Sequence, residues 1–242
     1  MAAITGFFAK IIGYPVQWIY SVLHDYGITI IIVTLIVRLC LLPLYRKQLK
    51  TSAKTAGLQS QIKEIQTRFA NNRERMNQEI NDLYAKAGVS PMSGCLPLLI
   101  QLPIMYGMFA ILRNPLTYMT ANEMIAAVHE SFLWITDLSQ PDPWLLPVLA
   151  GITTYLTSEL SMATQQAAGA NGMMATMKYF MPIMIFLMAR SFPAGLALYW
   201  TMGNVVMMVQ RYFFNRKRKK AEAQAEAEAE VLKRMKKENA TK

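Results

Sequence analysis

A single arginine, Arg38, lies inside an otherwise apolar block that runs from Gly27 to Leu44. Its position corresponds to about 17 Å along a helix that begins at Gly27, at about 1.5 Å per residue. A charge at that depth in a bilayer costs several kcal/mol unless it faces water, a partner or a polar cavity. Two interpretations stay open: the side chain extends past Leu39 to Leu44 towards the nearer interface, or it lies in a functional polar cavity.

Other polar residues inside the apolar blocks favour the cavity. Thr34 precedes Arg38 by one helical turn and shares its face. The remaining candidates are Gln101 in the second block, Thr154, Ser158 and Glu159 in the third, and Trp200 and Asn204 in the fifth. Each of them, taken singly, is more simply explained by an interhelical hydrogen bond worth about 1 kcal/mol. Together, on four blocks, they predict a hydrated interior surface.

The sequence carries none of the common patterns of catalytic or metal sites. GxSxG, HExxH, paired CxxC and phosphate-loop motifs are all missing, and His24 and His129 stand alone. Cys40 and Cys95 fall in or beside apolar segments, which argues against a disulfide framework. Glu159 alone cannot form a paired-carboxylate site. We therefore expect a protein that is not an enzyme and that uses no cofactor and no metal.

The composition indicates a membrane protein. Apolar residues make up 53% of the 242 residues, only 17% are charged, and the formal net charge is +10; soluble domains are about a quarter charged. The apolar residues collect in blocks that approach the roughly 20 residues needed to cross a bilayer. The expected spans are residues 26–44, 94–112, 144–160, 177–190 and 194–213. The expected fold class is an all-α polytopic membrane protein.

The pattern of residues 1–25 predicts an amphipathic segment that lies on the extracytoplasmic surface of the membrane. They show no apolar core followed by a small-residue cleavage site, as a secretory leader would. Apolar residues recur at helical spacing as far as Ile12, and we expect Pro15 to break the helix. Tyr14 and Trp18 are of types enriched at membrane interfaces. The alternative is a frayed start to the chain.

The segment 45–93 predicts a cytoplasmic helical hairpin. Apolar residues from Leu58 to Phe69 repeat at spacings of four, three and four, and the pattern resumes from Met76 to Tyr84. Each half reads as an amphipathic helix.

The charge distribution sets the expected orientation. Segment 45–93 holds nine Lys and Arg against four acidic residues, whereas the loop 113–143 holds one Arg and four acidic residues. Because basic segments stay in the cytoplasm, we expect the N-terminus outside and the C-terminus inside, which suits five spans. The loop 161–176 and the basic tail 214–242 are then cytoplasmic.

Four stretches carry a resemblance to a known family. They are ITIIIVTLIVRLCLLPL (28–44), LQSQIKEIQTRF (58–69), NQEINDLYAKAGVSPMSGCLPLLIQLPI (77–104) and SFPAGLALYWTMGN (191–204). In order and spacing they resemble the YidC family of membrane protein insertases, in the short form that has five spans.

The resemblance implies five core helices around a polar groove that is open to the cytoplasm and to lipid and closed towards the outside. Arg38 falls at the position of the groove arginine, and Gln101 and Trp200 fall near the groove. Many relatives carry glutamine in the third span, where this chain has Ser158 and Glu159. Glu159 is either a counter-ion for Arg38 or a marker of the interface.

The function implied is that of an insertase and membrane chaperone in a bacterial cytoplasmic (inner) membrane. It would act as a monomer on nascent membrane proteins, alone or beside the Sec translocon, in contact with membrane lipids. Two alternatives remain: a small-anion transporter or channel with Arg38 as its anion site, and a structural anchor for a cytoplasmic partner.

The basic run after the fifth span offers a contact for phosphate-bearing partners. It consists of Arg216, Lys217, Arg218, Lys219 and Lys220. Tails of this kind are associated with ribosome binding in the family, and RNA phosphates would attract the run in a salt-dependent way. Plain anchoring, or binding to anionic lipid, is the alternative.

Overall fold

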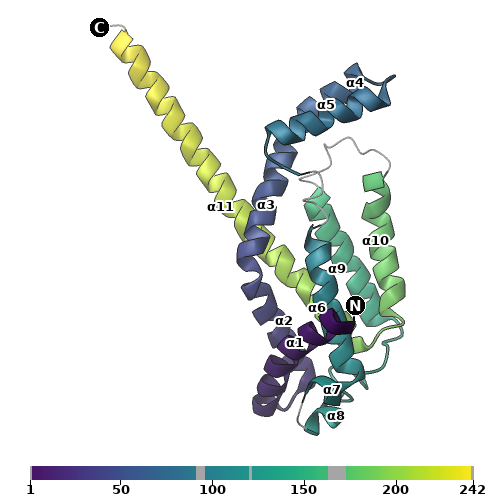
Figure 1. Ribbon diagram of the computed structural model, residues 1–242. Coiled ribbons are helices and arrows are strands. Elements are labelled where there is room, and N and C mark those ends of the chain that lie inside the picture. Colours follow the sequence, from purple (N-terminus) through teal and green to yellow (C-terminus); the bar gives the residue numbers. More distant parts are fainter. Residues whose placement is uncertain (1, 91–95, 120–121, 163–172, 241–242) are drawn as a thin grey trace. The chain divides into compact units, whose positions relative to one another are not determined.

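The computed structural model describes residues 2–90, 96–119, 122–162 and 173–240. The chain forms two compact units, Met1–Val206 and Met207–Lys242. Every regular element of the described residues is an α helix (Figure 1). The helices are α1 (Ala2–Leu23), α2 (Tyr26–Cys40), α3 (Leu42–Gly57), α4 (Gln59–Arg68), α5 (Arg73–Lys86), α6 (Leu96–Arg113), α7 (Pro115–Tyr118), α8 (Glu123–Ala127), α9 (Leu145–Met162), α10 (Met173–Ala189) and α11 (Ala194–Ala240). The predicted loop 161–176 lies largely outside the described residues.

Helix α1 runs without interruption through Pro15, so the expected break there is wrong. The helix packs on α6, and a Cβ at Gly107 of α6 would lie 3.2 Å from the backbone nitrogen of Ala9. This close approach buries Ala9, Ile12 and Val16. Tertiary packing of this kind compensates for the hydrogen bond that a proline removes from a helix interior.

The first apolar block is bent rather than straight. Helix α2 ends at Cys40, α3 begins at Leu42, and their axes differ by 59°. Pro43 in the first turn of α3 explains the break, because it has no N–H and its ring excludes the carbonyl four residues earlier.

One pair of helices has the length and composition of a membrane crossing. By length and composition, the bent pair α2–α3 is suited to crossing a bilayer, whereas none of the described helices meets that test alone. Three shorter apolar helices accompany the pair: Leu99–Arg113, Leu145–Leu160 and Tyr179–Ala189.

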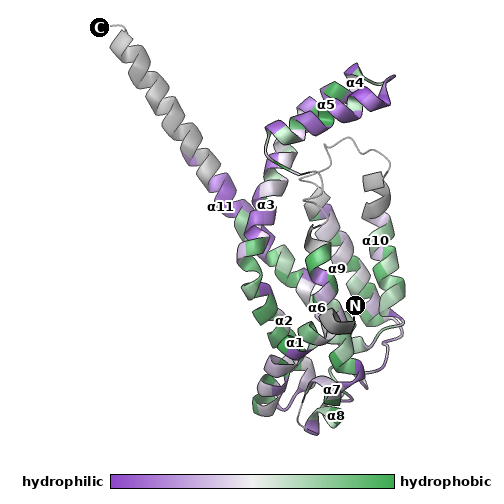
Figure 2. Cartoon of the chain, in the orientation of Figure 1, coloured by the Kyte–Doolittle hydropathy of each residue, from purple (hydrophilic) through white to green (hydrophobic). Residues whose placement is uncertain are grey.

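The main core of the first unit lies among α1, α2, α6, α9, α10 and the start of α11. Tyr26, Ile30, Met108, Ile111 and Tyr199 are among its most buried side chains, each at most 1% exposed. Figure 2 shows that α2 and the coloured part of α10 are mostly hydrophobic, whereas α3, α4 and α5 are more hydrophilic.

Helices α4 and α5 pack around a small core of their own. Ile62, Tyr84 and Val89 are buried there, apart from the main core. Burial raises the pKa of the Tyr84 phenol. At the turn between the two helices, the guanidinium groups of Arg68 and Arg75 lie 5.9 and 5.7 Å from the ring centre of Phe69. These contacts fix the turn by cation–π attraction.

Candidate functional site

A hydrogen-bonded cluster joins α9 to the first part of α11. The indole N–H of Trp200 donates to the hydroxyl of Thr154 at 2.8 Å. The side-chain amide of Asn204, one turn further along α11, lies 3.0 Å from that hydroxyl and 3.2 Å from the hydroxyl of Thr153. With its oxygen turned towards the cluster, the amide accepts from Thr154 and Trp200. Two predicted residues of α11 thus meet a predicted residue of α9.

A second polar contact joins α6 to α11. Gln101 donates from Nε2 to the hydroxyl of Tyr199 at 2.9 Å. Tyr199 is 1% exposed, and its ring belongs to the main core. A buried polar group normally needs a partner of this kind. Gln101, which the sequence placed alone in its block, therefore faces the other helices rather than lipid.

The guanidinium of Arg38 lies against the backbone of α11. A Cβ at Gly203 would lie 2.6 Å from Nη2 and 3.2 Å from Nε of Arg38, so only glycine leaves room for the guanidinium in this position. The hydroxyls of Tyr199 and Tyr45 interact electrostatically with the charge. Arg38 thus turns inwards to α11, next to the residues that hold Gln101.

The other predicted residues contribute less directly. The hydroxyl of Thr34 is fully buried and donates to the carbonyl of Ile30 at 2.7 Å, so its own helix satisfies it. Ser158 and Glu159 are half-buried on α9. The pairing of Glu159 with Arg38 stays a prediction.

Three residues of these contacts were missed from the sequence: Tyr199, Thr153 and Gly203. In the sequence, Tyr199 is simply an aromatic residue of an apolar block, and Gly203 is an ordinary helix residue. Thr153 is one of several threonines that lower the hydrophobicity of the third block. A glycine one residue before Asn204 was the available signal, since a helix glycine often marks a close approach.

The predicted basic run lies on α11 in the second unit. Arg216, Lys217, Lys219 and Lys220 are exposed, and Arg218 is half-exposed. Such a helix surface offers several positive charges to an anionic partner.

The loop after α8 ties several helices of the first unit together. The carboxylate of Glu130 accepts a hydrogen bond from the hydroxyl of Tyr20 in α1 and another, at 2.7 Å, from the backbone N–H of Tyr26 at the start of α2. The backbone carbonyls of Leu138 and Gln140 each accept from the N-terminus of α11 at 2.8 Å.

Asp142 joins the same loop to α9. Its carboxylate accepts from the indole N–H of Trp134 and the backbone N–H of Trp144, both at 2.9 Å, and from that of Leu146 at 3.3 Å. It therefore caps the free N–H groups at the start of α9. We call residues 128–142 the tie loop, because it bonds to α1, α2, α9 and α11.

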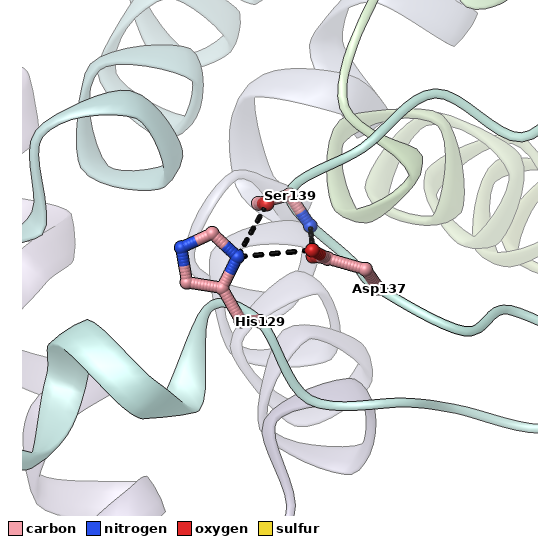
Figure 3. A network of polar contacts seen from close by, with 3 residues as sticks. All are labelled: His129, Asp137 and Ser139. Carbon is pink, nitrogen blue, oxygen red and sulfur yellow. Dashed lines mark hydrogen bonds and ion pairs between the residues drawn. The ribbon is translucent and has the colours of Figure 1, made fainter.

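His129, Asp137 and Ser139 of the tie loop form a polar network (Figure 3). The Nδ1 atom of His129 lies 3.0 Å from the Asp137 carboxylate and 2.8 Å from the Ser139 hydroxyl. A serine–histidine–aspartate relay needs the serine and the acid on opposite ring nitrogens. Here the Asp137 carboxylate and the Ser139 hydroxyl both contact Nδ1, so the network stabilises the loop and does not form such a relay.

Asp137 is the acidic residue of this network. Partial burial tends to raise the pKa of its carboxyl, but hydrogen bonds from His129 and Ser139 outweigh burial and lower the pKa. Within the described ranges, His, Cys, Asp and Glu side chains form no group of three or more that could hold a metal ion.

Comparison with known proteins identifies the class to which this fold and polar cluster belong. A sequence model described as "60Kd inner membrane protein" matches residues 18–222, and the chain belongs to this family of bacterial inner membrane proteins, which includes the YidC insertases. The resemblance seen in the sequence motifs is therefore confirmed.

Individual relatives carry the name of an insertase. The chain is 40% identical to "Membrane protein insertase YidC" of Oceanobacillus iheyensis over 225 residues, which cover 87% of this chain and 84% of the relative. It is 36% identical to "Membrane protein insertase MisCA" of Bacillus subtilis, covering 85% of this chain and 78% of the relative.

A solved structure shares the fold. It is described as "Active YidC insertase crystal structure with the first transmembrane domain resolved" and matches with a TM-score of 0.63 at 30% identity. The match covers 85% of this chain and 45% of that chain, so the solved protein is the longer of the two.

Proposed function

We propose that this chain is a membrane protein insertase and chaperone that moves hydrophilic tails of substrate proteins through a hydrated groove and releases their apolar segments into lipid. One observation supports this proposal above all. Polar side chains from three apolar helices converge on the first part of α11: Arg38 lies beside Gly203, Gln101 bonds to Tyr199, and Thr154 bonds to Trp200 and Asn204. Insertases of the same family are the relatives that match most of the chain.

The cluster would lower the cost of a polar tail in the bilayer. Its hydroxyl, amide and guanidinium groups exchange hydrogen bonds with water and with the tail, and Arg38 attracts acidic residues. The driving force is the transfer of the substrate's apolar surface into lipid, about 25 cal/mol per Å². For acidic tails moving outwards, the membrane potential adds about 2.3 kcal/mol per charge per 100 mV. No bound nucleotide is required.

The decisive experiment is insertion of a radiolabelled single-span substrate into liposomes that contain only this protein. Arg38→Ala should reduce insertion of a substrate with an acidic tail, while Arg38→Lys should retain much of it because the charge is what matters. Lys50→Ala, which removes an exposed basic residue of α3, is the matched control. Equal insertion by Arg38→Ala across several substrates would refute a role for this guanidinium.

The proposal includes five spans, with the N-terminus outside and the C-terminus in the cytoplasm. Under this topology the tie loop faces outwards and α4–α5 faces the cytoplasm. In a variant without Cys40 and Cys95, a cysteine at Asn122 should react with an impermeant reagent added to intact cells, and a cysteine at Asn72 should not. The opposite pattern would overturn the orientation.

The α4–α5 pair is proposed to act as a mobile lid or a first contact for incoming chains. Its three-residue core is small, and elements with few buried apolar contacts open readily. Hydrogen exchange across residues 59–86 should be faster than across α6 and α9. Uniformly slow exchange there would contradict the proposal.

The basic run of α11 is proposed to contact translating ribosomes. A chain lacking residues 221–242 keeps Arg216 to Lys220, so its binding at two salt concentrations separates this run from the distal tail. Reduced co-sedimentation with ribosomes would assign the contact to the distal tail. The proposal is completed by function as a monomer, alone or beside the Sec translocon. Insertion with and without the translocon tests its contribution, and the mass of the insertion-competent protein in detergent tests the monomer.

A further inference from the structure

A hollow of about 210 Å³ lies between α1 and α8. The side chains of Tyr14, Trp18 and Tyr20 line it from α1, together with Ser21, and Glu123 lines it from α8. Aromatic faces beside a carboxylate are the chemistry that recognises an organic ammonium group, through cation–π and ion-pair attraction.

The surroundings of the hollow are negatively charged. The hydroxyl of Tyr20 donates to Glu130, and the carboxylates of Glu130, Glu123 and Asp25 all act on the phenol. Burial is the first cause that raises the pKa of Tyr20 to about 12, followed by the hydrogen bond and charge of Glu130. Glu123 lines the hollow itself, and the charges of Glu130 and Asp25 add to the negative potential around it.

The same helix presents an unpaired apolar stripe. Its members are Phe7, Ile11, Tyr14, Trp18 and Val22, which are between 52% and 81% exposed. They recur every three or four residues along one face of α1, and exposed stripes of this type lie in the headgroup region of a bilayer. Tyr14 and Trp18 belong to both the stripe and the hollow.

A basic residue lies one helical turn before the hollow. Lys10 is exposed and precedes Tyr14 by four residues, which makes the two side chains neighbours on the helix surface. A positive group next to an aromatic and acidic hollow complements a headgroup in which phosphate and ammonium stand side by side.

We propose that the hollow between α1 and α8 binds the zwitterionic headgroup of a membrane lipid, with the ammonium among Trp18, Tyr14 and Glu123 and the phosphate at Lys10. The apolar stripe places the lipid, rather than a soluble amine, at the hollow, since the acyl chains continue along Phe7 and Ile11. This lipid site is independent of the proposed insertase groove.

Retention of lipid by the purified full-length chain tests the proposal. The protein in detergent is offered equal amounts of phosphatidylethanolamine and phosphatidylglycerol with identical acyl chains, and bound lipid is counted by native mass spectrometry. We expect wild type to retain phosphatidylethanolamine preferentially, by roughly 5-fold, as expected for a partly exposed cation–π and ion-pair site.

Three variants separate the parts of the site. Glu123→Gln should abolish the preference, and Trp18→Leu should reduce it while leaving an apolar contact with the membrane. Lys10→Gln should weaken retention of both lipids, because both carry phosphate. Glu74→Gln is the matched control, since it removes a carboxylate far from the hollow in sequence.

Three results would each overturn the proposal. One is an equal retention of the two lipids by wild type. Another is an unchanged preference in Glu123→Gln. The third is displacement of the bound lipid by an equal concentration of soluble glycerophosphoethanolamine, which would identify the ligand as a free amine rather than a lipid.

Discussion

The tie loop and the polar cluster are two polar regions of one helical unit, and they satisfy their polar groups in different ways. In the tie loop, the carboxylates of Glu130 and Asp142 each accept two or more hydrogen bonds, several of them from backbone N–H groups. In the cluster, neutral side chains such as Thr154 and Asn204 contact other side chains, and among the described residues there no backbone N–H group is held by a charged acceptor.

This difference has a physical consequence. Backbone donors held by a charged acceptor cannot move without disturbing a helix end, so the tie loop is built as a fixed closure. Side-chain hydroxyls and amides can exchange one another for water at little cost. The same unit thus combines one rigid end with one surface that is suited to hydration.

The largest expected effect comes from Gly27→Ala at the start of α2. The new Cβ would lie 2.1 Å from Cδ2 and 2.8 Å from Cβ of the Phe132 ring in the tie loop. The Cβ of Phe132 is attached to the backbone, so a change of side-chain rotamer cannot relieve the clash. We therefore expect a loss of about 1–3 kcal/mol or more in the free energy of unfolding. Thermal unfolding in one detergent measures it.

The matched change in the cluster is Gly203→Ala, which is expected to leave stability nearly unchanged. Its Cβ would meet only the guanidinium of Arg38, with Nη2 at 2.6 Å, Nε at 3.2 Å and Cζ at 3.3 Å, and these atoms form the far end of a flexible side chain. The guanidinium should move aside, and insertion of acidic-tailed substrates should fall. Equal loss of stability in both variants would erase the contrast between a fixed and a movable region.

The second effect concerns Glu130→Gln. The amide keeps the shape of the side chain but has no charge and only one acceptor oxygen. The hydrogen bonds from the Tyr20 hydroxyl and the Tyr26 backbone N–H are therefore weakened. We expect a loss of about 1–3 kcal/mol. Glu74→Gln, at an exposed site of α5, is the control and should unfold at the wild-type temperature. A wild-type melting temperature for Glu130→Gln would show that the tie loop is not held by its carboxylate.

The third effect concerns Thr154→Val, which removes the common partner of Trp200 and Asn204 at nearly constant volume. A loss of about 1 kcal/mol is expected for such a side-chain contact. Thr157→Val is the control, because that hydroxyl bonds the carbonyl of Thr153 in its own helix. If both variants insert substrate equally well, the cluster has no part in handling polar tails.

The smallest effect is a pH dependence of the tie loop. Since the pKa of Asp137 is lower in the folded chain than its usual 3.8, its contribution to stability is complete above that pH. The contribution is lost as the pH falls through the folded pKa. The backbone N–H of Ser139, which donates to Asp137 at 2.8 Å, should then exchange faster at pH 3 than the intrinsic rate change accounts for. Asp137→Asn should remove this dependence.

The sequence identified polar residues that form contacts between helices, while the hydrated groove stays a prediction. Polar side chains inside apolar blocks must find partners, and Gln101, Thr154, Trp200 and Asn204 do so in the folded chain. The rule identifies such residues one at a time, but it cannot pair them. The contact of Arg38 with Gly203 depends on how two distant helices cross, and a glycine carries no polar signal.

The tie loop was harder to foresee. Glu130, Asp137 and Asp142 entered the sequence argument only as charges that orient the chain. Their actual partners are backbone N–H groups and aromatic donors, whose positions are fixed by loop geometry. The continuous helix through Pro15 was missed for a related reason, because packing against α6 overrides the local preference of proline.

The separate core of α4 and α5 makes this pair a module. Ile62, Tyr84 and Val89 bury one another without side chains from the main bundle. Substitutions in α4 and α5 should therefore leave the packing of the main core unchanged. Residues 59–89 could then be exchanged for those of a relative without compensating changes elsewhere. A chimera of this kind would transplant whatever the pair recognises while leaving the membrane-embedded machinery as it is.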